Sequence, residues 1–124
     1  MQKKILIVDD DPNIVVSLEY LMKREGHAVA VAVDGEAALA AVKECEPDLI
    51  LLDIMMPKKD GFEVCRELRA NPAWPAIKVL MLTAKGRDAD RSKGFALGAD
   101  AYMTKPFSTK ELVAQVKHLL NEGP

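Results

Sequence analysis

Five side chains that can do chemistry stand at or just beyond the C-terminal ends of short apolar runs. They are Asp9, Asp10, Asp53, Thr83 and Lys105. If the runs form neighbouring strands, three carboxylates meet a hydroxyl and an ammonium group. Carboxylates at close range repel one another, and a divalent cation removes that cost. Mg²⁺ prefers oxygen ligands and often joins carboxylates to a phosphate oxygen, so the set predicts a Mg²⁺-dependent phosphate site.

The same set allows covalent chemistry, because a carboxylate can act as the nucleophile and form an aspartyl-phosphate. The metal reduces the repulsion between the two anions, and Lys105 can neutralise phosphoryl oxygens. The alternative for an acidic strand end is a solvated turn or a helix cap. We assign the cap to Asp11, because it precedes Pro12 in a typical helix start. Asp53 follows a wholly apolar run, where a charge at the core edge needs a partner.

Short apolar runs alternate with segments of helical periodicity along the chain. We predict five strands, at residues 4–8, 28–33, 49–52, 77–82 and 101–103. We predict five helices, at residues 12–25, after Asp34-Gly35, after Asp60-Gly61, at residues 88–97 and after the capping box at residues 108–111. The run at residues 49–52 has no polar alternation, which is typical of a parallel strand covered on both faces.

This alternation predicts an α/β fold. It is flavodoxin-like, a doubly wound five-stranded parallel sheet in the order 2-1-3-4-5 with five helices. Ligands bind outside the carboxyl ends of such strands, at the switch in strand order between strands one and three. That position brings Asp9, Asp10 and Asp53 together.

Composition limits the classes of protein to which the chain can belong. Its 124 residues predict one domain, residues 1–124. A net charge of −2 argues against direct nucleic acid binding. The two cysteines fit neither a metal spacing nor a disulfide framework. Without a signal peptide or an apolar run near the roughly 20 residues of a membrane helix, we expect a cytoplasmic protein with no membrane contact.

Four separated motifs resemble those of bacterial two-component response regulator receiver domains. They are residues 5–10 (ILIVDD), 51–57 (LLDIMMP), 82–84 (LTA) and 105–107 (KPF). The motifs occur in the family's order, and the resemblance covers essentially the whole chain. It implies a phosphoprotein of phosphorelay signal transduction. Such a protein accepts a phosphoryl group from a sensor histidine kinase or phosphotransfer protein and controls a downstream effector or output domain.

The resemblance also implies roles for the acidic residues. Asp53 is similar to the phosphoacceptor. Asp10 and Asp53 are similar to direct Mg²⁺ ligands, and Asp9 to an acid that holds metal-bound water. The backbone carbonyl of Met55 is implied as a further ligand. The resemblance implies no enzyme for outside substrates, but a phosphoacceptor that catalyses its own phosphorylation and dephosphorylation.

Three further residues carry implied roles in switching. Thr83 resembles the hydroxyl that moves onto the phosphoryl group, and Lys105 resembles the phosphate-binding lysine, with a cis bond to Pro106. Tyr102 resembles the aromatic residue whose ring changes exposure as Thr83 moves. From the residues alone, the alternatives are a β-branched strand residue, a solvated lysine and an amphipathic surface ring.

Positions around the site carry further expectations. In the family, the positions of Met55 and Lys85 tune the lifetime of the phosphoryl group, and we expect Met55 to hinder an attacking water. We expect Met55, Met56 and Met103 at the rim of the site and a solvated Lys58-Lys59 pair. Val15 or an adjacent apolar residue is expected to be exposed for the kinase. Trp74 is either a packing lid or a partner contact.

Other classes fit less well. Phosphatases of the haloacid dehalogenase type need a second Asp two residues after the nucleophile, where this chain has Met55. A degenerate receiver would not retain the full set of acidic residues, threonine and lysine. A flavin site would suffer repulsion from the acids after the first strand. Family members that dimerise through cross-pairs have an acid and an arginine where this chain has Ala101 and Gln115, so we expect a monomer or weak dimer.

Overall fold

The computed structural model describes residues 3–56, 58–74, 76–84 and 88–121. Strands and helices alternate along the chain, as predicted. The strands are β1 (Lys4–Val8), β2 (Ala28–Ala32), β3 (Leu49–Asp53), β4 (Lys78–Thr83) and β5 (Ala101–Thr104). The helices are α1 (Pro12–Arg24), α2 (Gly35–Cys45), α3 (Gly61–Ala70), α4 (Asp88–Ala96) and α5 (Thr109–Asn121).

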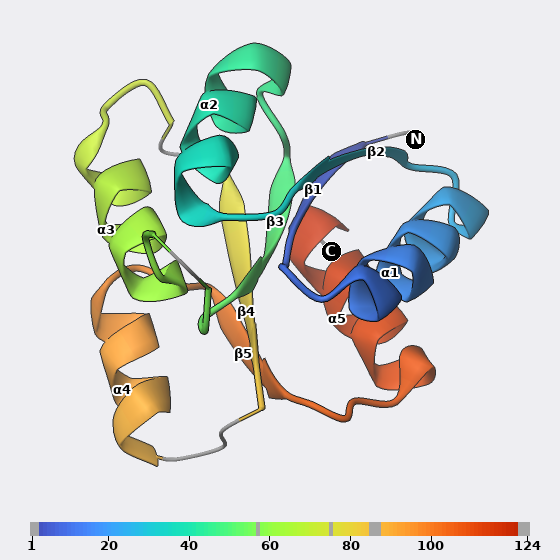
Figure 1. Cartoon of the computed structure of the whole chain (residues 1–124). Helices are drawn as coiled ribbons and strands as arrows, with labels where there is room; N and C mark the ends of the chain where they lie inside the picture. Colours follow the sequence, from blue (N-terminus) through green and yellow to red (C-terminus); the bar gives the residue numbers. More distant parts are fainter. Residues whose placement is uncertain (1–2, 57, 75, 85–87, 122–124) are drawn as a thin grey trace.

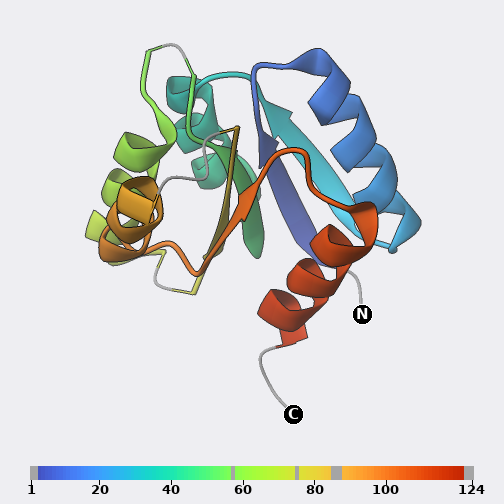
Figure 2. The same cartoon turned by 90° about the horizontal axis from the view of Figure 1, so that it is seen from below.

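The strands form one parallel sheet in the order β2-β1-β3-β4-β5, which confirms the predicted topology (Figure 1). Helices α2, α3 and α4 cover one face, and α1 and α5 cover the other (Figure 2). In the register, Val8 of β1 lies opposite Leu52 of β3. Asp53 therefore stands one position beyond that pair, next to the residues that follow β1.

The core consists of two apolar layers, one on each face of the sheet. Alternate residues of a strand point to opposite faces. Leu6 and Val8 of β1 accordingly belong to the layer under α2 and α3, and Ile5 and Ile7 to the layer under α1 and α5. All residues of β3 are buried, as expected of a central parallel strand. This burial makes the end of β3 a rigid and largely dry position for Asp53.

Three aspartates cap the helices that begin near this end of the sheet. Asp11 accepts a hydrogen bond from the amide of Asn13, Asp34 from Ala37 and Asp60 from Glu63. Each bond satisfies an amide that has no partner within the first helical turn. The cap assigned to Asp11 is thus confirmed, and its carboxylate is committed to α1.

Some local expectations were wrong. Lys58 is exposed, as expected, although its Nζ lies 3.6 Å from Asp34; Lys59 is half-buried and ion-paired with Glu67 at 2.6 Å, so it is not simply solvated. Met103 packs in the layer under α1 and α5, because its position in β5 points the side chain to that face.

Several element ends differ from the prediction by one residue. Helices α1 and α4 and strand β2 end one residue early, at Arg24, Ala96 and Ala32, whereas β3, β4 and β5 end one residue late, at Asp53, Thr83 and Thr104. Trp74 packs against the layer under α2 and α3, which favours the packing lid over an exposed contact. Among the described residues, no helix is both long and apolar enough to cross a bilayer.

Candidate functional site

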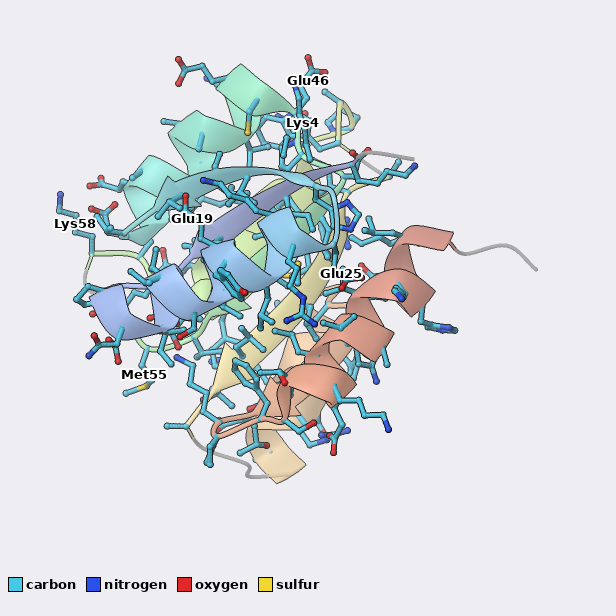
Figure 3. The ribbon with its side chains drawn as sticks, turned by 90° about the vertical axis from the view of Figure 1, so that its right-hand side faces the viewer. Lys4, Glu19, Glu25, Glu46, Met55 and Lys58 are labelled. Carbon is cyan, nitrogen blue, oxygen red and sulfur yellow. The ribbon has the colours of Figure 1, made fainter. Side chains whose placement is uncertain are left out.

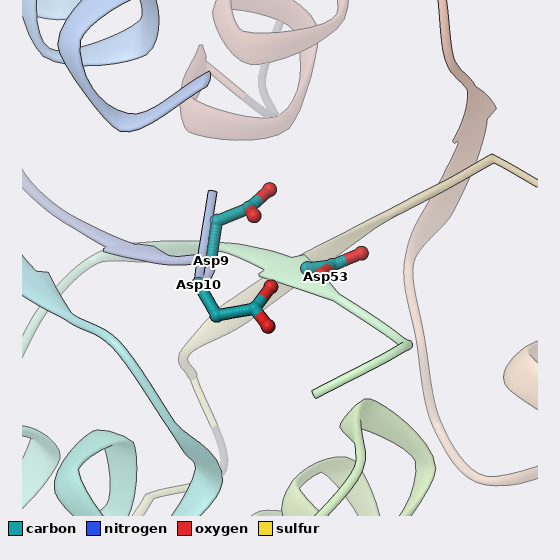
Figure 4. Close-up of side chains that lie close together, drawn as sticks. All are labelled: Asp9, Asp10 and Asp53. Atoms are coloured by element: carbon teal, nitrogen blue, oxygen red, sulfur yellow. The ribbon is translucent and has the colours of Figure 1, made fainter. Parts of the chain in front are cut away.

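The three predicted carboxylates meet at the carboxyl ends of β1 and β3 (Figure 4). Asp9 and Asp10 directly follow β1, and Asp53 is the last residue of β3. One carboxylate oxygen from each of the three residues lies within 4.8 Å of the others. The sheet order creates this cluster, since β1 and β3 are neighbours although forty residues separate them in the chain.

Burial and mutual repulsion make Asp53 a weak acid. Its side chain is almost fully buried, and Asp9 is buried beside it, whereas Asp10 is exposed. Burial is the main cause that raises the pKa of Asp53 to about 6, and the negative charge of Asp9 adds to the rise. The nearby Lys105 opposes this effect, but only in part. The site therefore has an excess of negative charge that is costly to hold in the folded protein.

Lys105 supplies the cation of the site. It follows β5, and its Nζ lies 2.8 Å from Asp9 Oδ2 and 3.4 Å from Asp53 Oδ1. Burial works against the charged form, but the two carboxylates outweigh it and raise the pKa of Lys105. The peptide bond to Pro106 is cis, as the resemblance implied. The alternative of a solvated lysine is wrong.

The donor set fits a hard divalent cation. Asp9 is engaged on both oxygens, because Oδ1 accepts the amide of Asp11 and Oδ2 accepts Lys105. One lysine offsets only one of the three carboxylate charges, so a net deficit of positive charge remains when all three are ionised. Mg²⁺ matches both that charge and the oxygen-only donor set.

Methionines and a helix cap form one wall of the site. A groove of about 410 Å³ is lined by Asp10, Met55, Met56 and Asp60. Met55 is 56% exposed there. The sequence predicted the two methionines at the rim of the site, but it predicted Asp60 only at the start of α3. The loop that joins β3 to α3 therefore borders Asp10 directly.

Thr83 and Tyr102 lie on adjacent strands and are both buried, which excludes a surface ring for Tyr102. Burial is the main cause that raises the pKa of Tyr102, while a hydrogen bond with the Thr83 side chain lowers it. The ring also faces α4: its centroid lies 6.5 Å from that of Phe95 and 5.3 Å from the Arg91 guanidinium. Nothing in the local sequence singled out these two α4 residues, although their i,i+4 spacing places them on one helix face.

The structure thus brings together Asp9, Asp10, Asp53 and Lys105, with Met55 on the wall. Thr83 is the last residue of β4, the strand beside β3, and its side chain is hydrogen-bonded to Tyr102. Lys85, the other position expected to tune the phosphoryl lifetime, lies outside the described residues.

Comparisons with known proteins agree on one family. The family model for the response regulator receiver domain matches residues 5–117. The alkaline phosphatase synthesis transcriptional regulatory protein PhoP of Bacillus subtilis (strain 168) is 51% identical over 123 residues. That match covers 99% of this chain and 50% of PhoP, so the chain spans about half the length of this curated relative.

Solved structures give the same result. A CheY-like response regulator receiver domain protein from Methanospirillum hungatei JF-1 matches with a TM-score of 0.92 at 31% identity, over 98% of this chain and 96% of that one. The receiver domain of a sensor histidine kinase from Pseudomonas aeruginosa PAO1, with a magnesium ion coordinated in its active site cleft, matches with a TM-score of 0.88 at 28% identity, over 98% and 99%. The sequence, the fold and the acidic cluster together show that this chain belongs to the response regulator receiver domain family, whose general function is phosphorylation-driven switching.

Proposed function

We propose that Asp53 accepts a phosphoryl group from the phosphohistidine of a sensor histidine kinase or phosphotransfer protein. The observation that carries this proposal is the meeting of Asp9, Asp10 and Asp53 around a shared space, with Lys105 on its border. In the transfer, an Asp53 oxygen attacks phosphorus, the bond from phosphorus to the histidine nitrogen breaks, and the nitrogen keeps the electron pair. With a pKa of about 6, Asp53 is mostly ionised near pH 7 and can act as the nucleophile.

Mg²⁺ is the cofactor that we assign to the site. Asp10, Asp53 and the backbone carbonyl of Met55 would hold it, and Asp9 would hold a water bound to it. When bound, the ion supplies the positive charge that reduces repulsion between Asp53 and the phosphoryl group. This assignment is supported by the oxygen-only donor set and by the raised pKa of Asp53, which burial causes first and the negative charge of Asp9 second.

Lys105 has two roles in this proposal. Before transfer, it partly neutralises Asp9 and Asp53. After transfer, it pairs with a phosphoryl oxygen on Asp53, because the phosphoryl group adds about −1.5 to −2 charges and strong acceptor oxygens. The chain also promotes its own dephosphorylation, in which a water attacks phosphorus and Asp53 is regenerated.

The conformational switch then follows because phosphorylation gives the Thr83 hydroxyl a new hydrogen-bond partner. Its hydroxyl turns from Tyr102 toward the phosphoryl oxygens, and Tyr102 changes its exposure. A ligand or modification shifts a conformational equilibrium only through contacts that differ between the two states. The hydrogen bond between the Thr83 and Tyr102 side chains provides such a contact in the unmodified chain.

We further propose that residues 1–124 act as one receiver domain in the cytoplasm, without direct contact with nucleic acid or membrane. Helix α1 is the kinase-facing surface, supported by Val16, which is 66% exposed next to Val15. The downstream partner is an effector protein or output domain. The similarity to PhoP, a transcriptional regulatory protein of about twice this length, supports an output of that kind. The receiver acts as a monomer or weak dimer.

Incubation with acetyl phosphate and Mg²⁺, followed by intact mass measurement, tests the proposal. We expect a mass increase of one phosphoryl group that requires Mg²⁺ and is absent from Asp53→Asn. Asp11→Asn is the matched control, because Asn caps a helix about as well as Asp. An unmodified wild-type chain, or an equally modified Asp53→Asn chain, would contradict the proposal.

A further inference from the structure

The described residues of the loop between β3 and α3 (residues 54–56 and 58–60) lie against two glycines at its ends. Gly61, the first residue of α3, donates a hydrogen bond of 2.9 Å to the Ile54 carbonyl. A Cβ at Gly61 would lie 2.5 Å from the carbonyl oxygen of Asp53. Gly35, the first residue of α2, adjoins the other end of the loop. A Cβ there would overlap the carbonyl oxygen of Lys59 and lie 2.5 Å from its Cβ.

These separations are far below an ordinary carbon contact of about 3.5–4.0 Å. An alanine at position 35 therefore fits only if the backbone at Lys59 moves by about one ångström. The neighbour is backbone and Cβ rather than the tip of a flexible side chain, so it cannot turn away. Helix α2 contributes no residue to the acidic cluster, yet the missing side chain of its first residue is what lets Lys59 of the bordering loop pack this close.

Charges add a second link between α2 and the loop. Lys58 Nζ lies 3.6 Å from Asp34 and 3.9 Å from Glu36. Lys58 is exposed, so these pairs are weak. The close fit at Gly35 is therefore the main constraint. Lys58 also has a φ of 68°, a left-handed conformation that favours glycine, and the closed loop holds it there.

The loop position matters because the loop forms a wall of the site. The groove beside Asp10 is lined by Met55 and Met56 of the loop and by Asp60. Figure 3 shows Met55 and Lys58 at the same end of the molecule. Lys59 directly precedes Asp60, so we expect a displacement at Lys59 to move a group that faces Asp10.

We propose that Gly35 is a positioning residue for the metal site. Because it has no side chain, the β3–α3 loop packs against the N-terminus of α2 in the position, relative to Asp10, that Mg²⁺ binding requires. This inference rests on the proposed function, because it takes the acidic cluster and the loop to hold Mg²⁺. The inference gives α2 a role in Mg²⁺ affinity although none of its side chains belongs to the acidic cluster.

Calorimetric titration with MgCl₂ tests the inference on the full chain. We expect Gly35→Ala to weaken Mg²⁺ binding about tenfold, the lower end of the loss seen when groups that orient metal ligands are removed. The matched control is Gly94→Ala in α4, where the added Cβ would also meet a close atom, the Met81 sulfur at 2.9 Å. Gly94 lies next to Tyr102 rather than the loop, so we expect it to bind Mg²⁺ as the wild type does.

A second readout separates positioning from loss of stability. We expect high Mg²⁺ concentration to restore the phosphorylation rate of Gly35→Ala with acetyl phosphate, because the defect is in metal binding. An unchanged Mg²⁺ Kd in Gly35→Ala, or an equal loss in Gly94→Ala, would overturn the inference. A rate that stays low at saturating Mg²⁺ would do the same.

Measurements on the unsubstituted chain keep the test independent of how the variants fold. On Mg²⁺ saturation we expect the amide resonances of Gly35 and Lys59 to shift with the same Kd as the site itself. Fixed resonances at both positions would overturn the inference while leaving the proposed function intact, provided the wild type binds Mg²⁺ and Asp53→Asn does not. A wild type that binds no Mg²⁺ would instead overturn the proposed function and this inference with it.

Discussion

The ammonium group of Lys105 donates a hydrogen bond of 2.8 Å to Asp9, a residue 96 positions earlier in the chain. Its distance to Asp53 is longer, at 3.4 Å. The lysine is therefore the internal counter-charge of both buried carboxylates. A divalent cation that binds the same carboxylates is repelled by the positive charge of Lys105.

Lys105→Met is accordingly expected to bind Mg²⁺ more tightly than the wild type, because the substitution removes a positive charge beside the site. The same variant should lose the phosphorylation-driven conformational change, because the phosphoryl group loses its partner. Calorimetric Mg²⁺ titration and amide spectra before and after acetyl phosphate measure the two effects. Lys110→Met, an exposed lysine of α5, is the matched control. Weaker Mg²⁺ binding by Lys105→Met would contradict this account.

Asp53→Asn is expected to stabilise the metal-free protein near pH 7. The rise of the Asp53 pKa from 3.8 to about 6 shows that ionised Asp53 is costly in the folded state. A rise of this size corresponds to about 3 kcal/mol at full effect. We expect a gain of about 1–3 kcal/mol in the free energy of unfolding. The gain can be smaller than the full effect because Asn loses the contact with Lys105. Urea denaturation with a chelator measures it, and a destabilised Asp53→Asn protein would refute the prediction.

The stability difference between wild type and Asp53→Asn should depend on pH. Between pH 3.8 and about 6, folded Asp53 binds a proton more tightly than unfolded Asp53. The wild type therefore loses stability relative to Asp53→Asn as pH rises through this window, and the difference is constant above it. Metal-free urea denaturation of both proteins across the window checks the sign. A difference that shrinks as pH rises would show that the pKa of Asp53 is lowered instead.

Met55→Asn is expected to shorten the lifetime of phosphorylated Asp53 several-fold. Met55 lies in the groove beside Asp10, where we expect its apolar side chain to hinder an attacking water. An amide at this position would admit and orient the water. The decay of the phosphorylated mass after removal of acetyl phosphate measures the lifetime. Met55→Leu keeps the apolar bulk and should decay like the wild type, and slower decay of Met55→Asn would refute the idea.

Thr83→Ala should separate phosphorylation from switching. The phosphoryl group can still form on Asp53, but Tyr102 loses the hydrogen-bond partner that connects it to the site. We expect phosphorylated Thr83→Ala to show little change in the ring resonances of Tyr102. Thr104→Ala, the exposed partner of Thr83 in the β4–β5 register, should respond like the wild type. If phosphorylated Thr83→Ala keeps full affinity for the downstream target, the coupling is wrong.

The order of elements and the acidic cluster could be predicted from sequence because they depend on local patterns. The apolar runs before Asp9 and Asp53 end at charged residues, and parallel topology places those ends at one edge. Strand order then determines which acids meet. No distance was needed to predict that Asp9, Asp10 and Asp53 are neighbours.

Contacts between separate elements could not be predicted in the same way. The fit of Gly35 against Lys59 depends on the distance between a helix and a loop, and neither residue differs locally from an ordinary helix start or surface lysine. The burial of Tyr102 depends on Arg91 and Phe95 of α4, whose pattern is weakly amphipathic. Sequence periodicity indicates which face is apolar, but not which side chain covers it.

Reductive trapping of the modified residue tests the central claim most directly. Borohydride reduces an aspartyl-phosphate to homoserine and releases phosphate, and fragmentation of the digested peptide then locates the product. After incubation with acetyl phosphate and Mg²⁺, we predict homoserine at position 53, and none when Mg²⁺ is chelated. Homoserine at position 9 or 10 in place of 53, or its formation without Mg²⁺, would contradict the account.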